Sequence, residues 1–229
     1  MKSSLPVLAY QKIGHAPKNS RLKNQWVSAK QLDKTLAFLV RRHYTFITPA
    51  NLQKKLPANP VLLTFFGGYQ SFYTEVFPLL QKYKASATLL VASDTLDAYN
   101  SWQDPFQEPW QNVLTSQQLK EVSKSGLVTV GTLGLSGKNL LACPNPQQAR
   151  EEILESMHRL KTLYKLDTCA VGFWPWAKDK NSAGTAAISD GLNLPVVTSA
   201  KGLNEPTDKQ FLRVMRPGLL TTLLLWKNS

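Results

Sequence analysis

Short apolar runs typical of buried strands alternate along the chain with segments whose apolar residues recur at helical spacing. Because strands alternate with helices, we expect parallel strands joined by helical crossovers. The expected strands are residues 6–13, 46–47, 61–65, 87–92, 128–131, 170–174, 195–198 and 212–214. Residues that can cap a helix precede four periodic segments, and these residues are Ser28, Ser71, Ser116 and Asn145.

Two features interrupt this regular pattern. Pro78 predicts a kink in the helix that follows Ser71, because proline removes a backbone donor and clashes with the preceding turn. Two long loops, residues 14–26 and 94–113, separate the predicted elements. The second loop carries more aromatic surface than a plain connection needs, with Tyr99, Trp102, Phe106 and Trp110.

Length and composition fit one α/β domain. The chain has 229 residues, of which 43% are hydrophobic, enough for a buried core. No apolar run approaches the ~20 residues that a membrane-spanning helix needs, and the first residues carry no apolar signal-peptide core. We therefore expect no transmembrane segment, and the cellular compartment stays open. Whether Cys143 and Cys169 pair also stays open, because the sequence does not show their proximity.

The charge balance is strongly basic. Lys and Arg number 27 against 15 Asp and Glu, which gives a formal net charge of +12 and a pI near 9.7. Such a field attracts anionic partners. The lysines are dispersed, however, and no helix-turn-helix, zinc knuckle or basic arm indicates nucleic-acid binding. We expect a solvated basic surface, with an acidic glycan or a protein as the partner and no nucleic acid.

One short motif carries a family resemblance. The sequence Thr-Phe-Phe-Gly-Gly-Tyr at residues 64–69 closes a predicted strand and leads into a periodic segment. It resembles the T-F-D-D-G-Y motif of the polysaccharide deacetylase family, metal-dependent carbohydrate esterases that remove acetyl groups from sugars. The resemblance implies a general base at the first aspartate position and a metal ligand at the second. Phe66 and Gly67 stand there, and neither side chain can accept a proton or bind a divalent ion.

The resemblance extends over nearly the whole chain. Residues 5–10 are similar to the family's first strand, P-V-L-x-Y-H, with Gln11 in place of the histidine. Residues 131–137 occupy the place of a two-histidine metal motif, with Leu133 and Gly137 at the histidines. Further matches cover residues 27–44, 114–128, 149–163 and 173–176. The resemblance implies a distorted, incomplete (β/α) barrel, one domain of residues 1–229. With these substitutions we expect no catalytic residue, no metal and no cofactor.

A groove is expected at the carboxyl ends of the barrel strands, where active sites of such barrels lie. Besides the degenerate positions, this rule places a set of candidate groove residues around one mouth, namely Tyr10, Tyr69, Trp174, Trp176 and Arg213. Aromatic faces suit the C–H faces of sugar rings, but tryptophan is also common in buried barrel layers. The sequence leaves both interpretations open.

Two interpretations of function follow. The first is a catalytically inactive deacetylase homologue that binds a glycan or a protein partner. The alternative is a metal-dependent hydrolase that removes acetyl groups from an amino-sugar polysaccharide through replacement ligands. The chain has three histidines, and we expect none of them at the mouth: His15, His43 and His158. A structural subunit that docks a partner through the loop 94–113 is a further hypothesis, and a nucleic-acid binder is the weakest.

Overall fold

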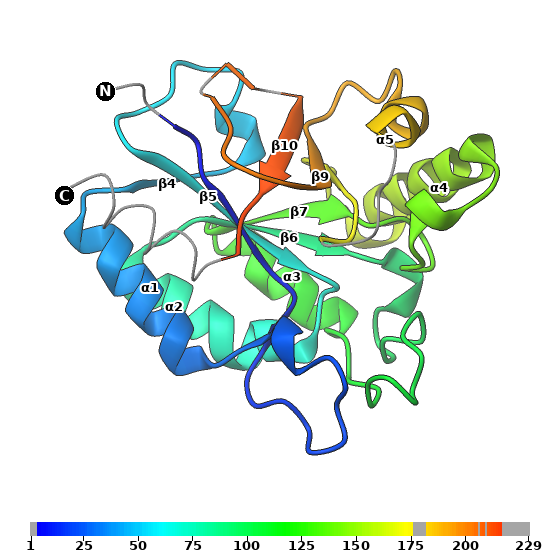
Figure 1. Cartoon of the computed structure of the whole chain (residues 1–229), viewed down its shortest axis with the longest axis horizontal. Coiled ribbons are helices and arrows are strands. Elements are labelled where there is room, and N and C mark those ends of the chain that lie inside the picture. The colour runs from blue at the N-terminus through cyan, green and yellow to red at the C-terminus, as the bar shows by residue number, and fades with distance from the viewer. Residues whose placement is uncertain (1–3, 176–181, 206, 209, 217–229) are drawn as a thin grey trace.

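Parallel strands form one curved sheet at the centre of the molecule (Figure 1). The computed structural model describes residues 4–175, 182–205, 207–208 and 210–216. The sheet has the order β1-β5-β6-β7-β8-β9-β10, and β4 also pairs with β5. Its strands are β1 (Val7–Tyr10), β4 (Thr45–Ile47), β5 (Pro60–Phe66), β6 (Ala87–Val91), β7 (Val128–Thr132), β8 (Val171–Gly172), β9 (Val196–Lys201) and β10 (Phe211–Val214). A separate two-stranded sheet joins β2 (Lys12–Ile13) to β3 (Trp26–Val27).

The sheet closes on itself through the residue that follows β10. Met215 pairs in parallel with Leu8, accepts a hydrogen bond from the Ala9 amide at 3.0 Å and donates one to the Val7 carbonyl at 2.8 Å. On the opposite side of the barrel the strand pairing is shorter, because β8 has two residues and pairs with β7 between Thr132 and Val171. The predicted distorted barrel of parallel strands is thereby confirmed.

Helices cover the outside of this barrel on two sides (Figure 1). Leucines of α1, α2 and α3, among them Leu36, Leu80 and Leu119, belong to one outer cluster. Ile153 of α4 and Ile188 of α5 belong to another cluster, against β8 and β9. The helices are α1 (Ala29–Arg41), α2 (Phe77–Tyr83), α3 (Ser116–Lys124), α4 (Pro146–Tyr164) and α5 (Ser182–Ser189). No helix in the described ranges is long and apolar enough to cross a membrane.

Side chains of β5 alternate between the outer clusters and the barrel interior. Leu63 and Phe65 pack outward against the helices, whereas Leu62 and Phe66 belong to the inner cluster. This alternation follows from the two-residue period of a strand. Phe66 is 1% exposed, and burying a side chain of this size stabilises the fold by about 1.5–3 kcal/mol. The barrel interior is thus filled with apolar side chains up to the end of β5.

Two of the four predicted helix starts are confirmed, and two need correction. Ser28 accepts from the Gln31 amide in a capping box, and Asn145 accepts from the Gln147 amide. For α3 the cap is Thr115, because Ser116 is already helical. Ser71 has helical backbone angles and caps nothing with its side chain. The chain there enters a π-helical turn, Phe72–Val76, ahead of α2, so the irregularity precedes the proline predicted to cause it.

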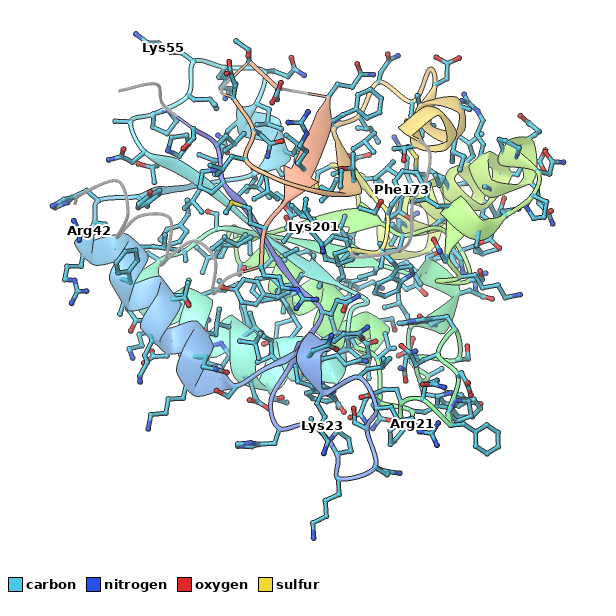
Figure 2. All side chains as sticks on the ribbon, viewed as in Figure 1. Arg21, Lys23, Arg42, Lys55, Phe173 and Lys201 are labelled. Atoms are coloured by element: carbon cyan, nitrogen blue, oxygen red, sulfur yellow. The ribbon has the colours of Figure 1, made fainter. Side chains whose placement is uncertain are left out.

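Basic side chains are spread over the molecule. Arg21 and Lys23 project from the loop 14–26, while Arg42 and Lys55 lie at other edges (Figure 2). All four residues are exposed. The two cysteines are both free thiols, and burial raises the pKa of the Cys169 thiol to about 11.

Candidate functional site

The degenerate family positions lie together at the carboxyl ends of β5 and β7. Phe66 is the last residue of β5, Gly67 follows it, and Leu133 directly follows β7. Phe66 and Leu133 are each 1% exposed, and both belong to the inner cluster, against which Trp174 packs. The Trp174 indole N–H donates to the carbonyl of Gly137 at 2.8 Å. The fold therefore brings the four substituted positions to one end of the barrel.

Aromatic rings occupy this end of the barrel in a connected series. The ring centroids of Phe66 and Trp174 are 6.3 Å apart, and those of Trp174 and Trp102 are 5.5 Å apart. Tyr69 meets Trp102 edge-on at 6.0 Å. Contacts of this geometry stabilise a pair beyond the area it buries. Trp102 comes from the loop 94–113, so the series connects three separate parts of the chain.

These residues do not fit the metal that the family resemblance implies. A Cβ at Gly67 would lie 2.6 Å from Cε2 of Tyr69 and 3.1 Å from Cη2 of Trp174. A Cβ at Gly137 would lie 2.6 Å from Cε3 of Trp102 and 2.9 Å from the Cβ of Ala92. Both glycines have positive φ, +94° and +75°, which disfavours other residues. Within the described ranges, no three His, Cys, Asp or Glu residues are grouped to hold an ion.

A cavity of about 320 Å³ opens beside the ring series, and we call it the aromatic cavity. All of its lining residues are uncharged: Gln11, Gln25, Tyr69, Trp102, Gln103, Gly137, Asn139, Trp174 and Pro175. Oε1 of Gln11 is buried and has no hydrogen-bond partner among the residues that the structure describes. A buried acceptor without a partner costs about 1–3 kcal/mol, so a ligand donor there would gain that contact. The arrangement is suited to a polar, uncharged ligand with an apolar face.

Two of the predicted groove residues lie elsewhere. Tyr10 is buried in the outer cluster, where its ring stacks on Phe65 at 4.9 Å, and burial raises the pKa of its hydroxyl. Its neighbour Ala9 belongs to the inner cluster, so strand alternation turns Tyr10 toward the helices. Arg213 is exposed on β10, with its amide bound to Oδ1 of Asn204, and it is absent from the cavity lining. Trp176 lies outside the described residues.

The aromatic residues of the loop 94–113 contribute to the cavity only in part. Trp102 lines it, whereas Tyr99 and Trp110 stack on each other with centroids 4.5 Å apart. The Trp110 indole donates to the carbonyl of Gln103 at 2.8 Å, and its side chain stays 46% exposed. Phe106 is 83% exposed and does not line the cavity. Of the four aromatic residues noted on this loop, Trp102 is therefore the one that reaches the cavity.

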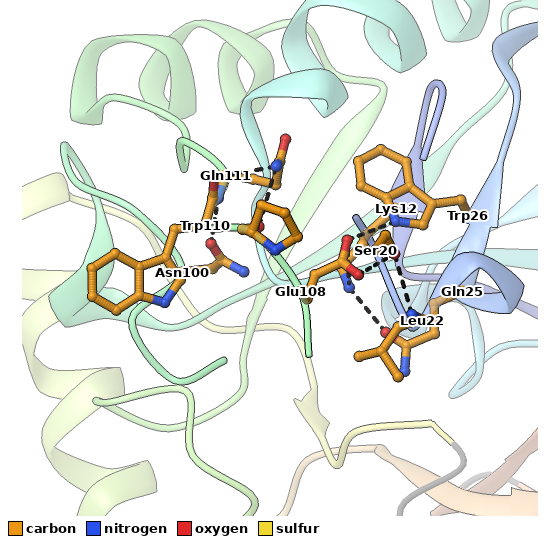
Figure 3. A network of polar contacts seen from close by, with 10 residues as sticks. Lys12, Ser20, Leu22, Gln25, Trp26, Asn100, Glu108, Trp110 and Gln111 are labelled. Atoms are coloured by element: carbon orange, nitrogen blue, oxygen red, sulfur yellow. Dashed lines mark hydrogen bonds and ion pairs between the residues drawn. The ribbon is translucent and has the colours of Figure 1, made fainter. Parts of the chain in front are cut away.

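A buried ion pair beside the cavity was not predicted from the sequence (Figure 3). Lys12 and Glu108 are 1% and 0% exposed, and Nζ lies 3.6 Å from Oε1. The Trp26 indole donates to the same oxygen at 2.8 Å, and the Ser20 hydroxyl donates to Oε2. Burial lowers the pKa of Lys12, and Glu108 opposes that shift. The pair connects β2 to the loop 94–113, and the bond from Ser20 to Glu108 joins the two long loops. No local sequence signal predicts these contacts.

This ion pair also holds one wall of the aromatic cavity. Nζ of Lys12 donates to Oε1 of Gln25 at 3.0 Å, and Gln25 lines the cavity. The amide of Arg21 donates to the carbonyl of Gln107 at 2.9 Å, which adds a main-chain link between the same loops. The loops that carry Gln25 and Trp102 are therefore fixed to each other.

A closed barrel of parallel strands with a cavity at the strand ends defines the α/β barrel class. The family model described as polysaccharide deacetylase matches residues 53–193, more than half of the chain. The chain belongs to the polysaccharide deacetylase family.

Sequence relatives agree with this assignment. YxkH of Bacillus subtilis, named for the polysaccharide deacetylases, is 26% identical over 206 residues, which cover 86% of this chain and 65% of that protein. The poly-beta-1,6-N-acetyl-D-glucosamine N-deacetylase of Escherichia coli is 32% identical over 115 residues, 46% of this chain and 17% of that protein. The chain thus spans less than two thirds of the length of these relatives.

Solved structures share the fold. IcaB from Ammonifex degensii has a TM-score of 0.79 at 22% identity, covering 99% of this chain and 98% of that one. The Streptococcus pyogenes deacetylase PplD, solved with acetate, has a TM-score of 0.74 at 21% identity, covering 97% and 98%. At this level of identity the likeness establishes the barrel and not the chemistry.

Proposed function

We propose that this chain is a catalytically inactive member of the polysaccharide deacetylase family that binds a glycan in the aromatic cavity. Metal-assisted deacetylation needs an ion to polarise the carbonyl and a base to activate water. The family positions for those groups hold Phe66, Gly67, Leu133 and Gly137. The observation that carries the proposal is that rings of Tyr69, Trp102 and Trp174 pack against Gly67 and Gly137 while a cavity remains open beside them.

The lining of the cavity supports a sugar as the ligand. Trp102 and Trp174 offer aromatic faces, and the side chains of Gln11, Gln103 and Asn139 offer amide donors and acceptors. Sugars combine apolar C–H faces with hydroxyl groups, so both kinds of contact are used. An acidic glycan would gain attraction from the net charge of +12, although no charged side chain lines the cavity. A protein partner remains the competing ligand.

The alternative, a metal-dependent hydrolase acting on an acetylated amino-sugar polysaccharide, needs replacement ligands at the same mouth. An open catalytic site for zinc typically has three protein ligands that are imidazoles, thiolates or carboxylates. Acetate release from acetylated hexosamine oligomers, measured with and without added zinc or cobalt, separates the two functions. We expect no release above background, because losing base and metal removes most of an acceleration of at least ~10⁶-fold. Turnover by the unmodified chain would overturn the proposal.

Binding is tested by titrating the protein with acetylated hexosamine oligomers and following tryptophan fluorescence. We expect dissociation constants of about micromolar to millimolar, as suits a few stacked rings and amide contacts. Trp102→Ala and Gln11→Leu should each weaken binding. Phe106→Ala is the matched control, since Phe106 is an exposed aromatic residue of the same loop that does not line the cavity. Equal losses in Trp102→Ala and Phe106→Ala would contradict binding in this cavity.

A further inference from the structure

A second cavity, of about 270 Å³, opens next to the first, and we call it the side cavity. Tyr69 lines both cavities, and the neighbours Gln25 and Trp26 line one each. The side cavity is lined by residues of four segments: Lys12, Ile13, Gly14 and His15; Trp26; Tyr69, Gln70, Ser71, Thr74 and Glu75; and Gln111 and Asn112. A chain of sugar units bound in the aromatic cavity could therefore continue past Tyr69.

Glu75 gives the side cavity an uncompensated negative charge. It is half-buried and is the one carboxylate on the lining. With the described residues Glu75 forms neither an ion pair nor a hydrogen bond. A Cβ at Gly14 would lie 3.0 Å from Oε1 of Glu75, so the glycine, at φ +119°, lets the carboxylate approach the main chain.

The other charged group of the side cavity already has its partner. Nζ of Lys12 lies 3.6 Å from Oε1 of Glu108, and it stands 5.9 Å from the ring centroid of Trp26 and 6.0 Å from that of Tyr69. His15 is exposed at the rim. The carboxylate of Glu75 is therefore left to bind a cation that enters from solution.

The rest of the lining identifies the kind of cation. Hydroxyl and amide side chains surround Glu75, and Trp26 and Tyr69 add ring surface, which is the mixture that binds sugars. We propose that the side cavity binds an amino-sugar unit whose amine is not acetylated, through an ion pair between that ammonium group and Glu75. This inference rests on the proposed glycan binding and names its ligand: a partly deacetylated amino-sugar polymer.

Whether the sugar amine is acetylated decides how well the sugar unit binds beside Glu75. An ammonium group gives the carboxylate a charge-assisted hydrogen bond, whereas an acetamido group would bury the carboxylate beside an apolar methyl. An acidic sugar would place like charges together. The net charge of +12 opposes a cationic polymer, but charges farther away than about 10 Å are screened at 0.1 M salt, and Glu75 acts at contact distance.

The test compares three hexosamine oligomers of equal length and linkage: fully acetylated, fully deacetylated, and partly deacetylated. Calorimetry should give the tightest binding for the partly deacetylated oligomer. Glu75→Gln keeps the shape of the side chain and removes its charge. It should weaken binding of both amine-bearing oligomers by about tenfold and leave the fully acetylated oligomer unchanged. Glu155→Gln is the control, because Glu155 is exposed on α4, away from both cavities.

The outcomes separate this inference from the proposed function. If acetylated oligomers bind and Trp102→Ala weakens them while Glu75→Gln changes nothing, the aromatic cavity stands and the side-cavity assignment is wrong. Equal weakening of all three oligomers by Glu75→Gln would overturn the assignment as well, because a structural effect is indifferent to acetylation. If none of the oligomers binds, the proposed function fails and this inference fails with it. Selective weakening of amine-bearing oligomers, lost at a pH that deprotonates the sugar amine, supports it.

Discussion

At the scale of single residues, neighbouring aromatic rings leave no space for a larger side chain at Gly67 or Gly137. Gly67 and Gly137 combine positive φ with neighbours closer than 3.0 Å to a Cβ position. The positions of Tyr69 and Trp102 therefore favour glycine at these two positions. A side chain could return only if an aromatic ring moved.

Gly137→Ala should destabilise the protein for two separable reasons. The positive φ alone costs about 1–2 kcal/mol, and overpacking against the ring of Trp102 adds about 1–3 kcal/mol. Gly126→Ala is the matched control, because its φ of +74° is nearly that of Gly137 at +75°, while nothing lies within 4 Å of its Cβ position. Urea unfolding measures both variants. Equal losses of stability would show that the ring contact at Gly137 carries no cost.

Restoring the family residues together should not restore activity. The variant Phe66→Asp, Gly67→Asp, Leu133→His, Gly137→His places four polar side chains where apolar rings and the inner cluster now pack. We expect a less stable protein that releases no acetate when zinc or cobalt is supplied. Circular dichroism shows whether the variant is folded. Acetate release by a folded variant would mean that the rings yield easily and that only the catalytic set was lost.

At the scale of elements, the two long loops are joined by a polar cluster whose ion pair is as completely buried as the core. Lys12 lies on β2, and Glu108 lies on the loop 94–113. Ser20 of the loop 14–26 also donates to Glu108, so the cluster joins β2 and both loops. A buried ion pair of this kind is weak evidence for stability, because the cost of desolvation offsets the attraction. Removing one partner is nevertheless costly, because the other charge is left buried and unpaired. Its consequence for function is the placement of Gln25 and Trp102 on the cavity wall.

Glu108→Gln should destabilise the protein by about 3–5 kcal/mol, because it leaves the Lys12 ammonium buried without an anion. The double variant Lys12→Met, Glu108→Gln should recover most of the loss. Chemical denaturation of the single and double variants, together with the oligomer titration, checks both stability and the cavity wall. If the double variant loses as much stability as Lys12→Met and Glu108→Gln lose together, the two groups are not coupled.

The same pair predicts how stability depends on pH. The pKa of Lys12 is lowered in the folded state by burial, so the unfolded chain binds more protons between the folded pKa and the ordinary pKa of lysine. Stability contributed by this residue therefore rises with pH across that window. In Glu108→Gln the opposing effect of the carboxylate is gone, so the rise should begin at lower pH. Unfolding curves from neutral to alkaline pH, with Lys12→Met as the control, measure it. An unchanged profile would contradict the assignment.

At the scale of the whole molecule, the sequence predicted the barrel because its strands and family motifs occur in order along nearly the whole chain. It placed the degenerate positions at one end for the same reason. It did not predict which side of β1 Tyr10 faces, since a strand-end position does not specify a face. It also missed Lys12 with Glu108, and it did not single out Trp102 among the aromatic residues of the loop 94–113. Long loops carry no periodicity that fixes tertiary contacts.

The net charge predicts a second mode of binding, which does not use the aromatic cavity. The exposed residues Arg21 and Lys23 lie on one loop, while Arg42 and Lys55 lie at other edges (Figure 2). A field of +12 therefore attracts any polyanion without a single docking patch. An anionic polysaccharide should therefore bind weakly at low salt and dissociate as salt shortens the screening length to about 10 Å at 0.1 M and less above it.

Salt titrations with the variants separate these two modes. Binding of uncharged acetylated oligomers should change little between low and high salt, because every side chain on the aromatic cavity is uncharged, and it should fall in Trp102→Ala. Binding of the anionic polymer should fall steeply with salt and be the same in Trp102→Ala as in the unmodified chain. If instead Trp102→Ala weakens the anionic polymer and spares the acetylated oligomers, the cavity is the site of an acidic glycan, as the charge alone would suggest.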